Sequence, residues 1–301
     1  MWPYGLDGLC DYAPVAVRDL PAPGRVARLR SRLGLGPRAE AQSAFTWDEN
    51  AAFRMQVAVP YERFASGVIW LTDRIERGAD TARMVDVLRG ADTLWVLSEA
   101  QVAPLRELFG SGGPDVVAVP FGIDATFFAA RPVPERPRIV SVGNDRDRDP
   151  QTLFRALALV HERRPDVELV VQTDAADAPD GVQVVPRMSH ADLRELYATA
   201  SVVATATRPN LHVSGMTVTL EAFATGRPVV NTDTPGMSRY VRDGETGHLV
   251  PLGDAEAMAG RLLDLLDDPA RLSAMGAAGR DDVDARFTTQ HMCAELAAIL
   301  L

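Results

Sequence analysis

Two runs of alternating strand-like and helix-like segments, separated by a proline-rich stretch, constrain the fold of this chain more than any other feature. Short segments rich in valine, isoleucine and leucine alternate with longer segments of helical spacing, which is typical of parallel α/β sheets. The stretch 129–137, AARPVPERP, has no apolar periodicity and indicates a linker. A length of 301 residues also favours two domains over one. We therefore predict an α/β protein of two Rossmann-like, doubly wound domains that face a central cleft.

The two runs predict the following elements. The expected strands of the first run are 15–18, 43–47, 68–71, 93–97 and 116–119, and its expected helices are 25–33, 51–59, 80–89 and 100–109. The expected strands of the second run are 139–142, 168–172, 182–185, 202–205 and 228–232, and its expected helices are 152–163, 192–199 and 217–224. Met1 is followed directly by Trp2-Pro3-Tyr4-Gly5, which looks like the end of a strand, so we expect the first strand to be short or missing. The predicted domains are 1–133 and 134–286, with 287–301 as a C-terminal helix that could pack back on the first domain.

Composition excludes several classes of protein. With 31 lysines and arginines against 41 aspartates and glutamates, the net charge is −10, which repels polyanions, so no nucleic-acid partner is expected. Cys10 and Cys293 form neither a CxxC pair nor a disulfide framework, which excludes a structural zinc site and favours a reducing compartment. No apolar run approaches the ~18 residues needed to span a bilayer, and the start lacks a basic region followed by an apolar one. We therefore expect a cytoplasmic protein. Its content of alanine and arginine is compatible with a high-GC bacterium and with secondary metabolism.

A polar loop, 143–149 (GNDRDRD), comes directly after a predicted strand and before a predicted helix. Free backbone N–H groups and the helix dipole favour an anion at such a place, so we interpret the loop as a phosphate site with Arg148 as its cation. The alternating carboxylates Asp145, Asp147 and Asp149 could instead bind a divalent metal together with a sugar nucleotide, or form a solvated charged turn. Arg148 would compete with a metal ion among these carboxylates, so no metal is expected.

A second polar segment opens a predicted helix at Ser214-Gly215-Met216-Thr217. The N–H groups of a first helical turn are free, and glycine lets an anionic ligand come close. Glu221 follows Thr217 by four residues and shares its helix face, so the Glu221 carboxylate could hold a pair of hydroxyls while the helix end holds a phosphate. In the alternative interpretation, Ser214 is a cap and Glu221 is an exposed helix residue.

The segment 220–254, LEAFATGRPVVNTDTPGMSRYVRDGETGHLVPLGD, resembles the donor-binding half of family 4 of the glycosyltransferases, the retaining class with the GT-B fold. The segment 265–287, LLDDPARLSAMGAAGRDDVDARF, is similar to its closing helices, and Ser98 with 119–124, VPFGID, resembles the end of its first domain. The resemblance begins near Gly67 and continues to the C-terminus. It implies an acceptor domain at 1–133 and a nucleotide-sugar donor domain at 134–286.

The resemblance also implies roles for residues of the donor domain. Glu221 matches the glutamate that binds the nucleotide ribose. The segment 215–217 matches positions of the family whose backbone amides contact the diphosphate. Arg148 matches a lysine of the family that contacts the same diphosphate, and 186–188 match positions that contact the nucleobase. The expected donor-binding residues are Gly143, Asn144, Arg148, Arg187, Met188, Ser214, Gly215, Met216, Thr217 and Glu221.

Three positions depart from the family pattern. Val213 stands in place of the first glutamate of the E-x7-E motif, and Asn144 stands in place of the arginine that follows the strand glycine. Thr72, in the segment 68–73 (VIWLTD), takes the place of a histidine that ends a strand and contacts the donor sugar. His212 could substitute as a polar contact to that sugar, and the alternative is an ordinary surface histidine.

The first domain offers candidates for the acceptor side, all at expected strand ends: Tyr4, Gly5, Asp48, Glu49, Thr72, Asp73 and Ser98. The adjacent carboxylates of Asp48 and Glu49 could position or activate an acceptor hydroxyl. Asp48 could equally cap the helix that follows it.

A short basic amphipathic stretch carries Arg25, Arg28 and Arg32. It could make weak contact with an anionic membrane or a phosphorylated acceptor, or form a solvated helix face.

These observations predict a glycosyltransferase that moves a sugar from a nucleotide-diphosphate donor to a hydroxyl or amine of a small-molecule, lipid or natural-product acceptor. The resemblance implies retention of configuration. The candidate catalytic residues are Arg148, Asp73 and His212, acting by positioning and by stabilising the leaving diphosphate, without metal or other cofactor. Two alternatives stay open: a non-catalytic GT-B partner of another transferase, and a GT-B sugar-nucleotide epimerase. The epimerase would need catalytic carboxylates in the cleft.

Overall fold

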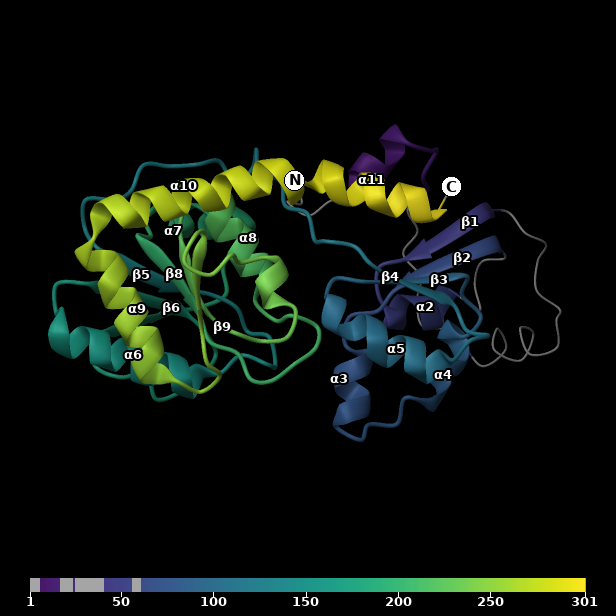
Figure 1. Cartoon of the computed structure of the whole chain (residues 1–301), viewed down its shortest axis with the longest axis horizontal. Coiled ribbons are helices and arrows are strands. Elements are labelled where there is room, and N and C mark those ends of the chain that lie inside the picture. Colours follow the sequence, from purple (N-terminus) through teal and green to yellow (C-terminus); the bar gives the residue numbers. More distant parts are fainter. Residues whose placement is uncertain (1–5, 17–23, 25–40, 56–60, 301) are drawn as a thin grey trace. The chain divides into compact units, whose positions relative to one another are not determined.

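The computed structural model describes residues 6–16, 24, 41–55 and 61–300, and the chain divides into two compact units (Figure 1). The first unit comprises Leu6–Pro120 and the chain from Met292 onward, and the second unit comprises Phe121–His291. Each unit has its own sheet and its own hydrophobic core.

The first unit is built on a four-stranded parallel sheet with the strand order β1-β2-β3-β4. The strands are β1 (Ala41–Thr46), β2 (Tyr61–Gly67), β3 (Thr93–Val96) and β4 (Asp115–Ala118). The helices are η1 (Leu6–Asp11), α2 (Glu49–Met55), α3 (Leu71–Glu76), α4 (Ala82–Leu88), η2 (Glu99–Gln101), α5 (Val102–Phe109) and most of α11 (Thr289–Leu300). The end of α11 contacts the sheet edge, where Ser43 Oγ donates a hydrogen bond of 3.0 Å to the Leu300 carbonyl.

The apolar run 68–71 is not a strand, although its composition predicts one. The strand of this region, β2, ends at Gly67, and α3 begins at Leu71. Val68 and Leu71 are both fully buried, so the run is apolar because it turns inside the core. A short apolar run does not distinguish a strand from a buried turn. The predicted strand-end position of Thr72 and Asp73 is therefore wrong, since both residues lie in the first turn of α3, a helix that the sequence did not indicate.

The second unit is built on a six-stranded parallel sheet with the order β10-β9-β8-β5-β6-β7. The strands are β5 (Arg138–Ser141), β6 (Glu168–Gln172), β7 (Val182–Val185), β8 (Val202–Thr205), β9 (Val229–Thr232) and β10 (Gly247–Val250). The helices are α6 (Pro150–Arg163), α7 (His190–Ala198), α8 (Met216–Ala224), η3 (Met237–Arg239), α9 (Ala255–Asp267) and α10 (Pro269–Arg286). Strands β8 and β9 are buried throughout, which explains their continuous apolar sequence.

The strand order of the second unit indicates where a ligand would bind. Counted along the chain, the order is 3-2-1-4-5-6, so β5 and β8 are neighbours from which the connections run in opposite directions. Open α/β sheets bind ligands beyond the carboxyl ends of their strands at such a switch point. The loops after β5 and β8 are therefore the candidate ligand-binding loops.

In the part of the chain that the structure describes, we find no helix of the length and apolarity required to cross a membrane.

Candidate functional site

Backbone contacts join the loops that follow β5 and β8. Arg148 and Thr207 form an isolated antiparallel bridge. The Asp149 amide donates to the Ala206 carbonyl at 2.9 Å, and the Arg208 amide donates to the Asp147 carbonyl at 2.8 Å. Asp149 also caps α6, because its carboxylate accepts hydrogen bonds from the amide and the hydroxyl of Thr152. The polar loop predicted from the sequence is thus held against the second predicted segment.

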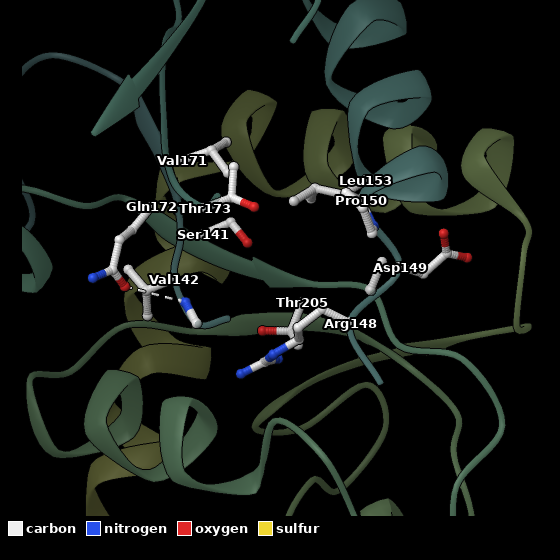
Figure 2. Close-up of a pocket in the computed structure, with 12 residues that line it drawn as sticks. Ser141, Val142, Arg148, Asp149, Pro150, Leu153, Val171, Gln172, Thr173 and Thr205 are labelled. Carbon is white, nitrogen blue, oxygen red and sulfur yellow. Dashed lines mark hydrogen bonds between the residues drawn. The ribbon is translucent and has the colours of Figure 1, made fainter. Parts of the chain in front are cut away.

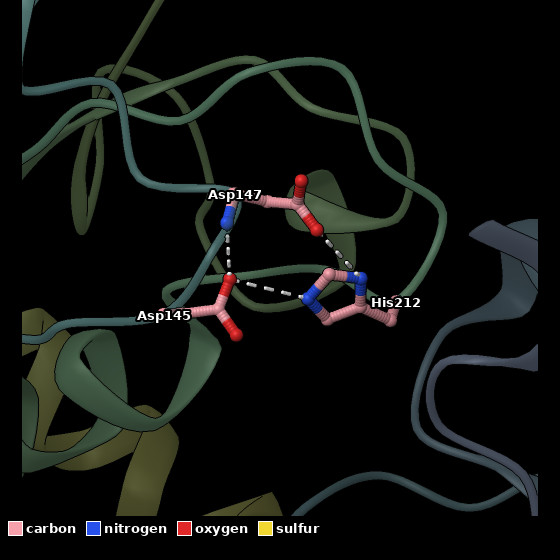
Figure 3. A group of neighbouring side chains, drawn as sticks. All are labelled: Asp145, Asp147 and His212. Atoms are coloured by element: carbon pink, nitrogen blue, oxygen red, sulfur yellow. Dashed lines mark hydrogen bonds and ion pairs between the residues drawn. The ribbon is translucent and has the colours of Figure 1, made fainter. Parts of the chain in front are cut away.

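Three side chains converge where these loops meet: Asp145, Asp147 and His212 (Figure 3). His212 Nε2 lies 3.5 Å from Asp145 Oδ1, and His212 Nδ1 lies 3.8 Å from Asp147 Oδ2. Asp145 Oδ1 also accepts hydrogen bonds from the Asp147 amide at 2.8 Å and from Ser214 Oγ at 3.0 Å. Burial raises the pKa of Asp145, but His212 and these hydrogen bonds outweigh it and hold the pKa well below its usual value. Asp145 is therefore ionised at neutral pH.

The cluster of Asp145, Asp147 and His212 is also the place where a metal ion would fit. One ligand atom from each residue lies within 4.8 Å of the others. The three alternating aspartates of the sequence do not act together, since Asp149 caps α6. The expectation that no metal takes part stays a prediction.

Arg148 lies between two glycines at the switch point. A Cβ at Gly143 would lie 2.6 Å from Arg148 Nη2, and a Cβ at Gly215 would lie 3.0 Å from Arg148 Nη1. Both glycines have positive φ, +112° and +96°, which other residues rarely adopt. The backbone conformation therefore favours glycine at both positions, and a side chain at either one would also have to share space with the guanidinium.

Two nitrogens of the Arg148 guanidinium have no hydrogen-bond partner among the described residues. Nε and Nη1 are both buried and unpaired, as is Oγ1 of Thr205 at the end of β8. Burial lowers the pKa of Arg148, whereas Asp145, Tyr197 and Glu221 favour its charged form. Unpaired buried donors are rare in native structures and indicate that an acceptor is missing.

A shallow pocket opens at this place, at the carboxyl ends of β5, β6 and β8 (Figure 2). Arg148, Thr205 and Gln172 contribute to its wall. The Gly143 amide donates to Gln172 Oε1 at 3.3 Å. The neighbouring Asn144 is exposed and donates to Asp174 at 2.7 Å.

The start of α8 has an unusual backbone. Val213 is fully buried and has a φ of +53°, a left-handed conformation that is costly for a β-branched residue, about 1–3 kcal/mol. The Ser214 amide donates to Asn210 Oδ1 at 2.9 Å, and the Met216 amide donates to the Val213 carbonyl at 3.1 Å. Thr217 lies in the first turn of the helix. Strain of this kind clusters at binding and catalytic sites.

Glu221 is buried one turn into α8. Only 2% of the residue is exposed, so it is not an exposed helix residue. Its Oε2 accepts a hydrogen bond of 2.6 Å from the hydroxyl of Tyr197, on α7. No sequence pattern indicates Tyr197, Thr205 or the contact between His212 and Asp145, because each depends on how separate elements pack.

The other donor-side candidates follow β7. Arg187 is exposed and Met188 is partly buried. Ser189 Oγ accepts from the Asp192 amide and donates to the Asp192 carboxylate, so Ser189 is the N-cap of α7.

Asp48 and Glu49 follow the carboxyl end of β1. Asp48 accepts from the Ala51 amide at 2.7 Å, so it does cap α2. Glu49 is fully buried and accepts from the amides of Ile69 and Trp70, both at 2.9 Å. Burial raises the pKa of Glu49, against the effect of these two hydrogen bonds.

The remaining first-unit candidates are inside the protein or outside the described residues. Thr72, Asp73 and Ser98 are buried, and Thr72 Oγ1 accepts from Gln101 Nε2 at 2.9 Å. The candidates outside the described residues are Tyr4, Gly5, Arg25, Arg28 and Arg32.

Comparison with known proteins places this geometry in context. Residues 136–268 match the family model described as glycosyl transferases group 1. D-inositol 3-phosphate glycosyltransferase of Arthrobacter sp. (strain FB24) is 33% identical over 223 residues, which cover 65% of this chain and 52% of that protein. The chain spans about half the length of the first curated relatives that it matches.

Solved structures show the same fold. Sucrose-phosphate synthase from Thermosynechococcus elongatus has a TM-score of 0.69 at 20% identity, over 85% of this chain and 72% of that chain. Anabaena HepE in complex with UDP has a TM-score of 0.71 at 14% identity, over 91% of this chain and 80% of that chain. The chain thus has the GT-B fold of two Rossmann-like domains, and within it residues 136–268 match the glycosyl transferases group 1 model.

Proposed function

We propose that this chain is a glycosyltransferase that binds a nucleotide-diphosphate sugar at the switch point of the second unit. The observation that carries the proposal is Arg148, whose Nε and Nη1 are buried and lack an acceptor among the described residues. A diphosphate supplies several acceptor oxygens and the negative charge that a guanidinium requires. The glycines on either side of Arg148 leave room for a ligand to approach the backbone.

The proposed roles of the other residues follow from their positions. Glu221 accepts hydrogen bonds from the ribose hydroxyls, and the start of α8 from Ser214 to Thr217 faces the diphosphate. Arg187 and Met188 lie at the nucleobase, and Gly143 and Asn144 line the phosphate loop. His212 contacts the sugar, held by the two carboxylates beside it. The UDP bound by the HepE structure and the glycosyltransferase name of the Arthrobacter relative support this class of donor.

The proposed mechanism uses positioning and charge. As the bond between the sugar and the diphosphate breaks, negative charge builds on the diphosphate. Arg148 and the amides at the start of α8 stabilise that charge in a site that is already organised. Asp48, Glu49, Thr72, Asp73 and Ser98 belong to the first unit and would receive a hydroxyl or amine acceptor. Retention of configuration, independence from metal and a cytoplasmic location are parts of this proposal.

Nucleotide binding tests the proposal directly. UDP, GDP, TDP and ADP are screened by thermal shift, where a ligand at 100 times its Kd adds about 2.7 kcal/mol to the free energy of unfolding. Glu221→Gln should weaken the binding of the best nucleotide by roughly 1.5–3 kcal/mol in calorimetry, because the hydrogen bonds from the ribose hydroxyls lose the negative charge of their acceptor. Glu256→Gln is the control, since Glu256 is an exposed residue of α9 paired with Arg155. The absence of any nucleotide binding would refute the proposal.

A second candidate is a non-catalytic partner of another transferase. It is favoured by Val213 and Thr72, which replace two polar residues of the resembling family and are both buried here. Such a protein would bind nucleotide without turning over the donor, and the donor would be consumed only in a complex with an active transferase. A transfer and hydrolysis assay on the isolated chain separates the two functions.

A further inference from the structure

Tyr197 contacts Glu221, the proposed ribose ligand, and has no role in the account given so far. Its hydroxyl donates a hydrogen bond of 2.6 Å to Oε2 of Glu221, from a different helix and 24 residues away in the chain. Tyr197 and Glu221 are 0% and 2% exposed. A short hydrogen bond from a hydroxyl to a buried carboxylate is of the charge-assisted kind, about twice as strong as a neutral one.

The tyrosine itself is held in place from several directions. Its ring packs edge-on against Phe128, with the ring centroids 6.2 Å apart. Its carbonyl accepts from Arg227 Nε at 3.2 Å, and Arg227 Nη2 donates to the carbonyls of Ala198 at 3.0 Å and Pro132 at 2.7 Å. Arg227 is fully buried, so these bonds fix the last turn of α7 relative to the segment before β5. The phenol therefore has little freedom to leave Glu221.

The position of Glu221 explains why its orientation matters. A carboxylate that binds two adjacent hydroxyls must present its oxygens in one particular plane, and rotation about its side-chain bonds would lose that geometry. A partner that fixes one oxygen removes this freedom before the ligand arrives, which lowers the entropic cost of binding. Arg148 lies near enough for Tyr197 and Glu221 to favour its charged form. Tyr197 thus belongs to the same cluster of polar side chains as Glu221 and Arg148, the proposed ligand of the diphosphate.

We propose that Tyr197 is a positioning residue of the nucleotide site, which holds the Glu221 carboxylate so that it selects ribose hydroxyls. This inference rests on the proposed function, because it takes Glu221 as the ribose ligand. It adds a residue to the site and predicts that the preference for a ribonucleotide over a nucleotide without ribose hydroxyls depends on Tyr197.

Tyr197→Phe tests the proposal, since it removes only the hydroxyl. The probes are UDP, GDP and ADP, with the 2′,3′-dideoxy form of whichever binds the wild type best, and the readout is the Kd from calorimetry. We expect the ribonucleotide Kd to rise about 3- to 10-fold, the range that one hydrogen bond provides, and the dideoxynucleotide Kd to change less than about 2-fold. Combined with Glu221→Gln, Tyr197→Phe should add nothing further, because both act through one contact.

Tyr240→Phe is the matched control. Tyr240 is also a fully buried tyrosine of the second unit, but its hydroxyl accepts from the Phe121 amide at 3.1 Å. This variant should keep the wild-type ratio of the dideoxynucleotide Kd to the ribonucleotide Kd. If Tyr197→Phe does not fold, Phe128→Leu replaces it as the test. Phe128→Leu loosens the packing of the Tyr197 ring and should lower this ratio by a smaller factor than Tyr197→Phe would.

Each outcome separates the two proposals. If Tyr197→Phe binds both nucleotides as the wild type does, or weakens both equally, Tyr197 does not position Glu221 and the inference fails while the proposed function stands. If the wild type binds none of the nucleotides, the proposed function fails and the inference falls with it.

Discussion

Ser214 Oγ donates a hydrogen bond of 3.0 Å to Asp145 Oδ1, across 69 residues of sequence. Ser214 begins the turn that leads into α8, and Asp145 lies in the loop after β5. The bond therefore ties together the two segments between which Arg148 lies. Because Asp145 is ionised, the bond is stronger than one between neutral groups. It organises the proposed phosphate site before any ligand binds.

Ser214→Ala should loosen this connection. We expect the free energy of unfolding to fall by about 1–2 kcal/mol, since Asp145 loses one of its donors, and the Kd for a nucleoside diphosphate to rise about 3- to 10-fold. Urea unfolding and calorimetry measure the two effects. Ser273→Ala, at an exposed position of α10, serves as the control. A drop in stability with unchanged nucleotide affinity would show that the bond supports the fold but does not organise the site.

His248 should make stability depend on pH. Only 3% of this residue is exposed, and Nδ1 lies 3.3 Å from Asp243 and Nε2 lies 3.3 Å from Arg271. Burial, assisted by Arg261 and Arg271, lowers its pKa below 6.5 despite Asp243. As the pH falls below about 6.5, His248 is therefore protonated in the unfolded chain but stays neutral in the folded chain. The free energy of unfolding should then decrease by up to about 1.4 kcal/mol per pH unit.

Urea unfolding between pH 7 and pH 5 measures that slope. His248→Gln should reduce it. His190, whose pKa is also lowered by burial and by Arg187, contributes to the same range, so His190→Gln gives the share that does not come from His248. A slope that His248→Gln leaves unchanged would place the titrating group elsewhere.

Most of the second sheet could be predicted closely from the sequence, because β5, β6, β8 and β9 are largely buried, whereas β10 was not predicted. Strands β6, β7 and β8 have the predicted bounds, and α6 and α8 begin within two residues of the predicted position. The strands of the first unit are harder to predict from the sequence. The N-terminal half of β2, from Tyr61 to Arg63, is polar and largely exposed, whereas the buried turn after Gly67 is apolar. A prediction from hydrophobicity therefore placed the strand at 68–71, in the buried turn, and missed β2 just before it.

The site could be predicted only at the level of loops. A polar loop after a strand and a glycine before a helix are visible in the sequence, and the structure does bring Arg148, Ser214 and Gly215 together. Contacts such as Tyr197 with Glu221 join side chains of two helices, and no local pattern encodes them. The roles of these residues in binding and catalysis stay predictions.

Chelation should leave nucleotide binding and transfer intact. The atoms of Asp145, Asp147 and His212 lie close enough to hold a metal ion, but Asp145 already accepts from Ser214 and from the Asp147 amide. A nearby guanidinium also disfavours a divalent cation. Transfer rates are compared before and after EDTA, and again with added magnesium or manganese. Activity that EDTA abolishes and manganese restores in the wild type, but not in Asp147→Asn, would establish a metal site.

Arg148 offers the sharpest test, because its place in the structure predicts a large effect on function and a small effect on stability. Most buried side chains stabilise the fold through the partners they contact. The Nε and Nη1 atoms of Arg148 have no partner among the described residues, and burial lowers its pKa, so its charge is costly to keep.

Arg148→Ala should therefore lower both donor affinity and kcat while changing the free energy of unfolding by less than about 1 kcal/mol. The effect on kcat arises because the charge on the leaving diphosphate is greater in the transition state than in the bound donor. Arg146→Ala is the matched control, since Arg146 is exposed two residues earlier in the same loop. Steady-state kinetics with the donor found by nucleotide screening, beside urea unfolding, measures both effects. A variant with wild-type kcat and KM would move the phosphate site to the start of α8 alone, whereas a large loss of stability would mean that Arg148 is a structural residue.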